Sequence, residues 1–158
     1  AHIAETVIGE EEKEEKERYL KTMKIIPAQC GLITFFVGRE RTIERLSGAL
    51  RGDSSKRMHL LYGPGGIGKS QLAAYLFNSL IETRAYSHAY WLNCQTTEVL
   101  HADYLRIAER IPDLFVDRRK VKSSIQKIRE YIENERCLLV FDDASNSREL
   151  SSFLPRKQ

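Results

Sequence analysis

The stretch GPGGIGKS, residues 63–70, gathers four glycines, a proline and a lysine into eight positions. Glycine loses more conformational freedom on folding than any other residue, so such a cluster is costly unless a special backbone path requires it. The apolar run Met58–Tyr62 precedes the stretch, and apolar rows at helical spacing follow Lys69. We therefore expect a buried strand, a glycine-rich loop and a helix that begins near Lys69.

The loop matches the phosphate-binding pattern G-x-x-x-x-G-K-[ST]. Its glycines let consecutive N–H groups point inward at phosphate oxygens, and the helix N-terminus adds unpaired N–H groups and a positive dipole end. We expect Lys69 to reach the terminal phosphates and the Ser70 hydroxyl to coordinate Mg²⁺. A chance loop is the weaker alternative. The predicted nucleotide-binding residues here are Gly63, Pro64, Gly65, Gly66, Ile67, Gly68, Lys69, Ser70 and Gln71.

A second motif, LLVFDDAS at residues 138–145, ends an apolar run in two acids. The run Cys137–Phe141 has no polar alternation, which indicates a strand buried on both faces. Ligands of α/β sheets bind at the carboxyl ends of strands, so Asp142 is placed to hold Mg²⁺. Asp143 is placed to polarise a water for attack on the terminal phosphate, and with Lys69 it forms the predicted catalytic pair. A helix cap or turn is the alternative for the two acids.

Strands alternate with helices along the chain, which implies an α/β fold with a parallel sheet and helices on its faces. Pro112 is expected to help end the helix at residues 99–111. The expected elements are a helix from Gly38 to about Leu50 ended by residues 52–55, a strand at 58–62, a helix from Lys69, a strand at 88–94, helices at 99–111 and 121–132, and a strand at 137–141.

The N-terminal part differs in composition. Opposite charges four residues apart, such as Glu12 and Lys16, predict a charged exposed helix over residues 10–23 with a thin apolar face. Pro27 and Gly31 then mark a linker. We expect residues 1–34 to form this helix and linker and residues 35–158 to form the nucleotide-binding domain.

The overall composition is that of a soluble globular protein, with 42% hydrophobic and 30% charged residues. The chain shows no apolar run long enough for a membrane span and no secretory signal, so we expect a cytoplasmic protein without a membrane partner. A net charge of +3 does not argue for nucleic acid, and the basic cluster at residues 117–122 is better explained as a solvated helix start. The three widely spaced cysteines fit a reducing compartment.

The motifs FVGRE (36–40), GPGGIGKS, YWLNC (90–94) and LLVFDDAS resemble, in order and spacing, the NB-ARC branch of the STAND NTPases. The resemblance covers about residues 35–155. It implies a P-loop NTPase three-layer sandwich that binds ATP or ADP with Mg²⁺. It also implies that backbone groups of Val37 and Gly38 line the adenine pocket and that Arg39 lies near the nucleotide; an ordinary solvated helix start is the alternative for these residues.

Members of that family continue through a fourth strand with a sensor arginine, which lies between the first and third strands. The 158 residues stop before it, and the first residue is alanine. We therefore expect a fragment of a larger multidomain chain, a sandwich incomplete at its C-terminus, and negligible ATP hydrolysis by these residues alone.

Three functions remain open at this point. The first is an ATP/ADP switch whose nucleotide state controls homo-oligomeric assembly in innate-immunity or cell-death signalling, with hydrolysis by the whole protein. The second is an AAA+ ATPase of the initiator or loader type acting on DNA, although such proteins favour a PGTGKT-like loop and an Asp-Glu pair. The third is a non-hydrolysing scaffold that nucleotide stabilises.

Overall fold

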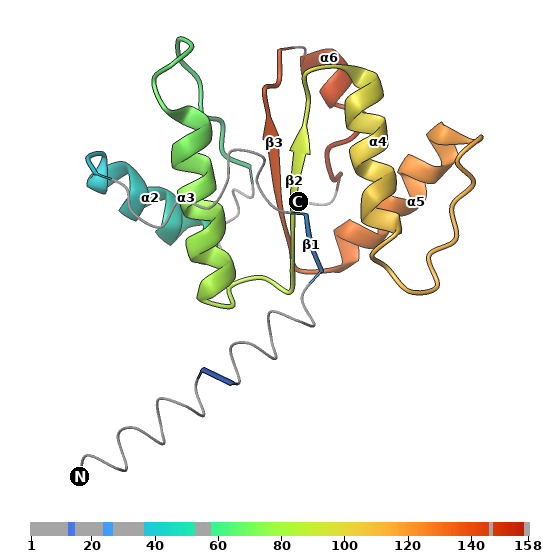
Figure 1. The fold of residues 1–158 in the computed structure, drawn as a ribbon, viewed down its shortest axis with the longest axis horizontal. Coiled ribbons are helices and arrows are strands. Elements are labelled where there is room, and N and C mark those ends of the chain that lie inside the picture. Colours follow the sequence, from blue (N-terminus) through green and yellow to red (C-terminus); the bar gives the residue numbers. More distant parts are fainter. Residues whose placement is uncertain (1–12, 15–23, 27–36, 53–57, 146, 157–158) are drawn as a thin grey trace.

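Three parallel strands form the sheet (Figure 1): β1 (Lys24–Ile26), β2 (His88–Asn93) and β3 (Cys137–Asp142), in the order β1-β2-β3. The computed structural model describes residues 13–14, 24–26, 37–52, 58–145 and 147–156. β2 and β3 pair over their whole length, from His88↔Cys137 to Asn93↔Asp142. The predicted strands at 88–94 and 137–141 are thus confirmed, and their carboxyl ends lie level with each other.

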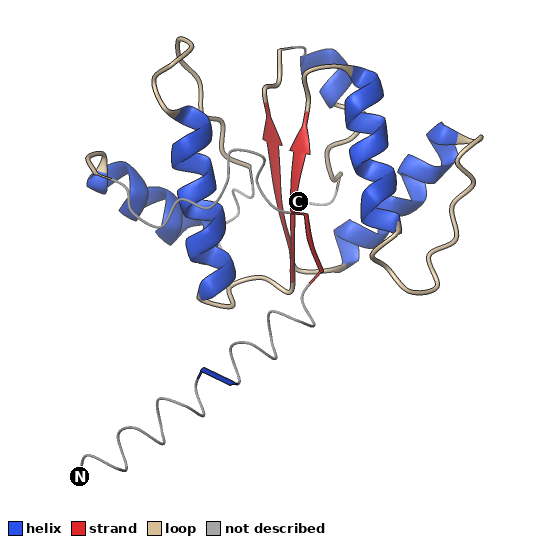
Figure 2. Ribbon diagram, in the orientation of Figure 1, coloured by secondary structure: helices blue, strands red, loops and turns tan. Residues whose placement is uncertain are grey.

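Helices cover both faces of this sheet (Figures 1 and 2), because the connections between parallel strands must cross over it. On one side lie α2 (Glu40–Arg51) and α3 (Lys69–Glu82). On the other side lie α4 (Thr97–Ala108), α5 (Val121–Asn134) and the short α6 (Ser147–Leu150). The α/β class with a parallel sheet is confirmed, while the described strands do not make up a complete P-loop sandwich.

Strand β2 is buried on both faces and separates two hydrophobic clusters. Ala89 and Trp91 point towards α3, where Phe77 meets the Trp91 ring edge-on with centroids 5.7 Å apart. Tyr90 and Leu92 point to the opposite face, into the cluster between α4 and α5. This alternation follows from the period of two along a strand. Trp91 is therefore a core residue.

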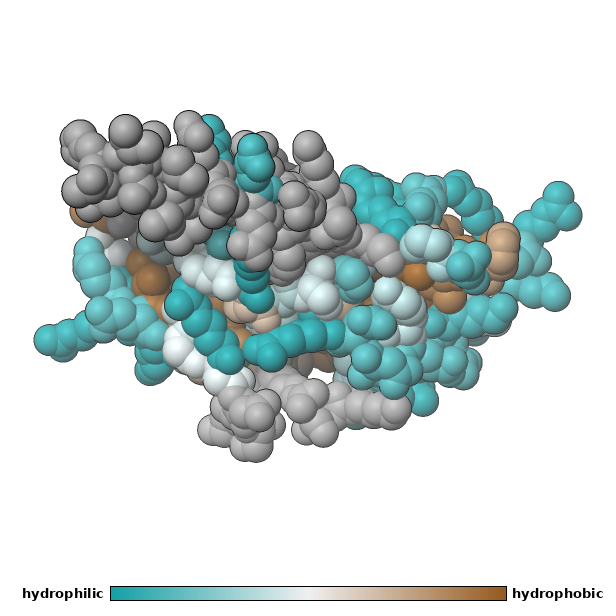
Figure 3. Space-filling model, turned by 90° about the horizontal axis from the view of Figure 1, so that it is seen from below, coloured by the Kyte–Doolittle hydropathy of each residue, from teal (hydrophilic) through white to brown (hydrophobic). Residues whose placement is uncertain are grey.

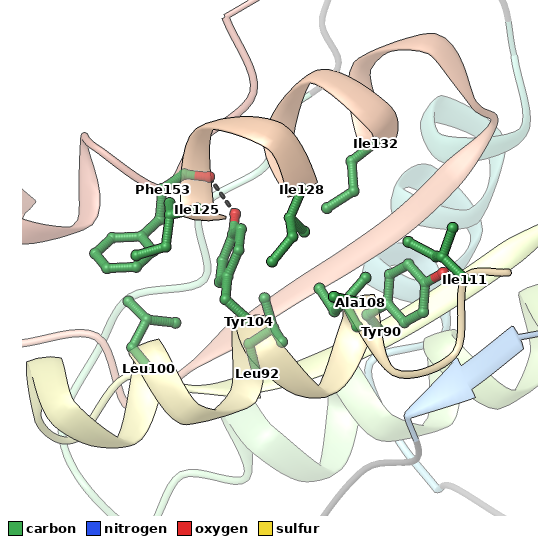
Figure 4. Close-up of a cluster of buried hydrophobic side chains, with 11 residues drawn as sticks. Tyr90, Leu92, Leu100, Tyr104, Ala108, Ile111, Ile125, Ile128, Ile132 and Phe153 are labelled. Carbon is green, nitrogen blue, oxygen red and sulfur yellow. Dashed lines mark hydrogen bonds between the residues drawn. The ribbon is translucent and has the colours of Figure 1, made fainter. Parts of the chain in front are cut away.

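The second cluster extends to the end of the chain through Phe153 (Figure 4). The Phe153 ring packs edge-on against Tyr104 of α4, and the Tyr104 hydroxyl donates a hydrogen bond to the Phe153 carbonyl oxygen. Arg129 of α5 donates to the neighbouring Ser152 carbonyl at 2.6 Å. The segment that follows β3 is therefore fixed against both helices on this face.

The boundaries of α4 differ from the predicted 99–111. The helix begins at Thr97 because the Thr96 hydroxyl accepts a hydrogen bond from the Val99 N–H at 3.2 Å and caps it. It ends at Ala108, since the chain tightens into turns in which Ile111 N–H bonds to the Ala108 carbonyl at 3.1 Å. Pro112 comes after the helix has already ended. The helices predicted after Gly38, from Lys69 and over 121–132 are confirmed.

The predicted strand at 58–62 is wrong. Met58, Leu60 and Tyr62 are 69%, 79% and 86% exposed, and the segment belongs to no sheet. Leu61 packs against the small cluster of α2 and α3 side chains, and His59 is also partly buried. The run keeps strand-like alternation, but a strand requires a hydrogen-bonded neighbour, and the described residues place none beside it.

The sequence did not predict β1, which lies in the segment assigned to helix and linker. Its three residues pair with the first half of β2, from Lys24↔His88 to Ile26↔Tyr90. Of the predicted N-terminal helix, only Lys13 and Glu14 are described, and both are helical. The rest of that prediction lies outside the described residues.

Hydrophilic side chains surround smaller hydrophobic areas on the face shown in Figure 3. Among the residues that the structure describes, no helix is both long and apolar enough to cross a bilayer.

The Tyr104–Phe153 hydrogen bond gives a test of the fold. Tyr104→Phe leaves a buried carbonyl without its donor, and we expect the free energy of unfolding to fall by about 1–3 kcal/mol. Tyr62→Phe makes the same chemical change at a side chain that is 86% exposed, so its effect should stay within about 0.5 kcal/mol. Urea unfolding followed by circular dichroism measures both, and equal stabilities of the two variants would contradict the described packing.

Candidate functional site

The glycine-rich loop turns directly into α3. Gly68 has φ +81° and forms the N-cap, with its carbonyl accepting the Leu72 N–H at 2.9 Å. Gly63 has φ +149°, and a Cβ there would lie 2.5 Å from Cδ1 of Ile67. An L side chain would be strained at both positions, so the loop needs glycine to follow this path.

Lys69, the first residue of α3, folds back over the loop. Its Nζ donates to the carbonyls of Gly63 at 2.9 Å and Pro64 at 2.7 Å. The ammonium therefore lies inside the curve of the loop, next to the N-terminus of the helix. A cation and a helix N-terminus at one point favour an anion, and an incoming phosphate oxygen would take the place of these carbonyls.

Ser70 and Asp142 meet across the structure. The Ser70 hydroxyl donates to Oδ1 of Asp142 at 2.7 Å, although 72 residues separate them in the chain. The contact forms because the N-terminus of α3 and the carboxyl ends of β2 and β3 lie at the same end of the fold (Figure 1). The two residues predicted to hold Mg²⁺ are thus brought together.

The donor set suits a hard cation that shares its ligands with a nucleotide. Hydroxyl and carboxylate oxygens are typical Mg²⁺ ligands, and Mg²⁺ usually binds through one or two protein groups together with phosphates and waters. Among the described residues, no group of three or more His, Cys, Asp or Glu side chains is placed to hold a metal. Ser70 and Asp142 are thus the two described oxygen donors that would fit such a cation here.

Asp143 is exposed and follows Asp142 in a left-handed conformation, with φ +58°. Its N–H donates to Oδ1 of Asp142 at 3.0 Å, so the same oxygen accepts from Ser70 and from Asp143. Asp tolerates this conformation better than most residues. The backbone turn directs the chain away from the strand immediately after the predicted metal ligand.

Arg39 reaches the loop from the start of α2. Its guanidinium donates to the Ile67 carbonyl, and its backbone has φ +60° at the N-cap of the helix. Val37 is exposed, and the Gly38 N–H donates to the Glu40 carboxylate at 2.9 Å. No hydrogen bond of the described residues joins Val37 or Gly38 to the loop. Of the three residues predicted near the nucleotide, only Arg39 contacts the loop in the structure.

A cavity of about 350 Å³ opens beside the loop, within the usual size range of small-molecule sites. Three of the predicted nucleotide-binding residues, Arg39, Ile67 and Lys69, line it. The other lining residues are Thr42, Leu60, Leu61, Tyr62 and Leu72. No local pattern identifies these residues, because they become neighbours only through the packing of α2 and the 58–62 segment against α3.

Cys94 lies at the end of β2, beside the acidic end of β3. Burial first, and then the negative charges of Asp142, Asp103 and Asp143, raise the pKa of the Cys94 thiol to about 12. Its backbone N–H donates to the Asp142 carbonyl at 2.8 Å and continues the pairing of the two strands. The thiol is therefore protonated at neutral pH, which fits the predicted reduced cysteine.

Asp103 is a further residue that sequence reasoning missed. It is 5% exposed, and it lies on the same face of α4 as the buried Leu100, Tyr104 and Ile107. An acid among the apolar positions of an amphipathic helix was the available signal, because a buried carboxylate needs hydrogen-bonding partners.

The family model AAA_16, the AAA ATPase domain, matches residues 36–156. Neither the curated proteins nor the solved structures give a significant match. The matched span covers most of the chain and includes the loop, Ser70 and Asp142. The chain therefore belongs to the AAA_16 family of AAA ATPase domains, within the P-loop NTPase superfamily.

The buried and acidic surroundings of Cys94 predict that its thiol is alkylated slowly. With a pKa of about 12, the thiolate fraction at pH 8 is about a thousandfold below that of an ordinary cysteine. In a Cys30→Ser, Cys137→Ser background, we expect iodoacetamide to alkylate Cys94 at least a thousandfold more slowly than a cysteine peptide, with the rate still rising with pH above 9. A rate within tenfold of the peptide would contradict this environment.

Proposed function

We propose that this chain is the nucleotide-binding module of a STAND-type signalling protein, in which bound ATP or ADP controls assembly into a homo-oligomer. The contact between Ser70 and Asp142 is the observation that supports nucleotide binding most directly, because it joins the two predicted Mg²⁺ ligands at 2.7 Å. AAA ATPase domains typically bind ATP or ADP with Mg²⁺.

Each residue has one task in this proposal. Backbone N–H groups of the loop and the Lys69 ammonium bind the phosphates. Ser70 and Asp142 would hold Mg²⁺, which would neutralise charge on the phosphates. Asp143, exposed beside them, orients the water that attacks the terminal phosphate in the assembled protein. Arg39 leaves the Ile67 carbonyl and contacts the nucleotide, and Val37 and Gly38 offer backbone groups to adenine.

The switch proposal is preferred to a DNA-acting AAA+ loader on two details of sequence. The loop reads GGIGKS rather than PGTGKT, and β3 ends in Asp-Asp rather than Asp-Glu. The AAA ATPase family match accommodates both functions. If DNA stimulates ATP turnover severalfold, the result favours the loader. If the exchange of ADP for ATP triggers assembly, the result favours the switch.

Lys69→Ala tests the phosphate-binding role. The variant removes the cation from the loop, and we expect its affinity for ADP·Mg²⁺ to fall at least a hundredfold by calorimetry, or about 2.7 kcal/mol in binding free energy. Lys127→Ala removes an exposed lysine from α5, on the other side of the sheet, and should bind ADP like the parent chain.

The comparison of the two lysine variants decides the assignment. A parent chain that binds ADP with the same affinity as Lys69→Ala would exclude the loop as the phosphate site. Equal losses in both variants would show that overall charge, rather than the loop, attracts the nucleotide.

A further inference from the structure

A buried carboxylate completes the end of β2 next to the proposed magnesium site. Oδ2 of Asp103 accepts a hydrogen bond from the Asn93 N–H at 2.8 Å. Oδ1 of the same carboxylate pairs with Arg106 Nη1 at 3.0 Å. Asp103 is 5% exposed, so both of its carboxylate oxygens make their hydrogen bonds in the protein interior.

The Asn93 N–H needs such an acceptor. Successive N–H groups of a strand point to opposite edges, and the Cys94 N–H points to β3, where it meets the Asp142 carbonyl at 2.8 Å. The Asn93 N–H therefore points to the β1 edge. The described pairing with β1 ends at Ile26↔Tyr90, three residues earlier. A buried N–H without an acceptor is costly, and among the described residues the Asp103 carboxylate supplies the acceptor for this N–H.

The turn after β2 is closed in the same way, by side chains. The Asn93 amide oxygen accepts the Gln95 N–H at 2.8 Å. The Thr96 hydroxyl accepts the Val99 N–H at 3.2 Å and starts α4. Asp103, one helical turn further along α4, thus ties the helix back to the last residue of the strand. Between these bonds lies Cys94, whose N–H holds the Asp142 backbone.

We propose that Asp103 is a positioning residue for the magnesium ligand Asp142. Its carboxylate holds Asn93, which keeps the Cys94 N–H on the Asp142 carbonyl and so keeps the Asp142 side chain in reach of Ser70. Asp103 itself contacts neither metal nor nucleotide. The part of this inference that concerns Mg²⁺ rests on the proposed function, whereas the part that concerns the strand end does not.

Two substitutions separate the acceptor from the charge. Asp103→Leu keeps the branched shape and removes both acceptor oxygens. Asp103→Asn keeps one acceptor for the Asn93 N–H and loses the charge. Arg106→Gln is the matched control, because it removes the ion pair and leaves the Asp103 carboxylate; the Arg106 side chain is 44% exposed and water can replace the pair.

The first measurement is amide hydrogen exchange by NMR on the complete 158-residue chain without nucleotide. In Asp103→Leu we expect exchange at Asn93 and Cys94 to speed up at least tenfold relative to the buried Ala74 of α3. Asp103→Asn and Arg106→Gln should stay within threefold of the parent. Unchanged exchange at Asn93 and Cys94 in Asp103→Leu would overturn the assignment.

The second measurement is ADP affinity with Mg²⁺ and with EDTA. In Asp103→Leu we expect the gain in affinity that Mg²⁺ supplies to fall about tenfold, while affinity in EDTA stays within twofold of the parent. Asp103→Asn should keep the gain in ADP affinity from Mg²⁺ at the level of the parent chain. An equal loss with and without Mg²⁺ would make the residue merely structural and overturn the positioning role.

The two measurements distinguish the inference about Asp103 from the proposed nucleotide-binding function. A parent chain that binds no ADP contradicts the proposed function, and amide exchange alone then decides the role of Asp103 at the strand end. If Asp103→Leu does not fold, Asp103→Asn still decides. A more than tenfold smaller gain in ADP affinity from Mg²⁺ in Asp103→Asn than in the parent chain would overturn the proposal.

Discussion

The hydrogen bond between Ser70 and Asp142 joins the two motifs on which the proposed function depends. Ser70 lies in the first turn of α3 and Asp142 ends β3, 72 positions further along the chain. A parallel arrangement brings a helix N-terminus and strand carboxyl ends to the same edge of the fold, where α/β proteins bind their ligands. Lys69 on the loop and the Ser70–Asp142 pair therefore lie at the same edge of the fold.

Strand β2 supports the contact between Ser70 and Asp142, although it supplies no predicted ligand. Its two faces fill the clusters on both sides of the sheet, with Trp91 towards α3 and Tyr90 towards α4 and α5. Its last residues align β3 through the pairing of Asn93 with Asp142 and the bond from the Cys94 N–H. Disturbing β2 would thus move the acidic end of β3 away from the loop.

Local sequence signals predicted most of the elements and the loop, and non-local constraints account for the failures. The loop, α3 and β3 were recognisable because glycine placement and apolar runs determine them within a few residues. Met58–Tyr62 has the apolar run of a strand, but whether it pairs depends on a neighbouring strand. In the family that the sequence resembles, another strand lies between the strand expected at residues 58–62 and the strand that ends at Asp142. The described residues contain no strand at that place.

The candidate site shows the same division. The pairing of Ser70 with Asp142 was predictable from two motifs and a resemblance. The cavity wall formed by Thr42 and Leu72 depends on how α2 packs against α3, which no local pattern encodes.

The most direct test is a crystal structure of the chain with ADP and Mn²⁺ in place of Mg²⁺, using the anomalous signal to locate the metal. The account predicts the β-phosphate inside the 63–70 loop beside Lys69. It also predicts one metal bound to the Ser70 hydroxyl and to Asp142, directly or through a water. ADP bound away from the loop, or a metal without contact to either residue, would contradict it.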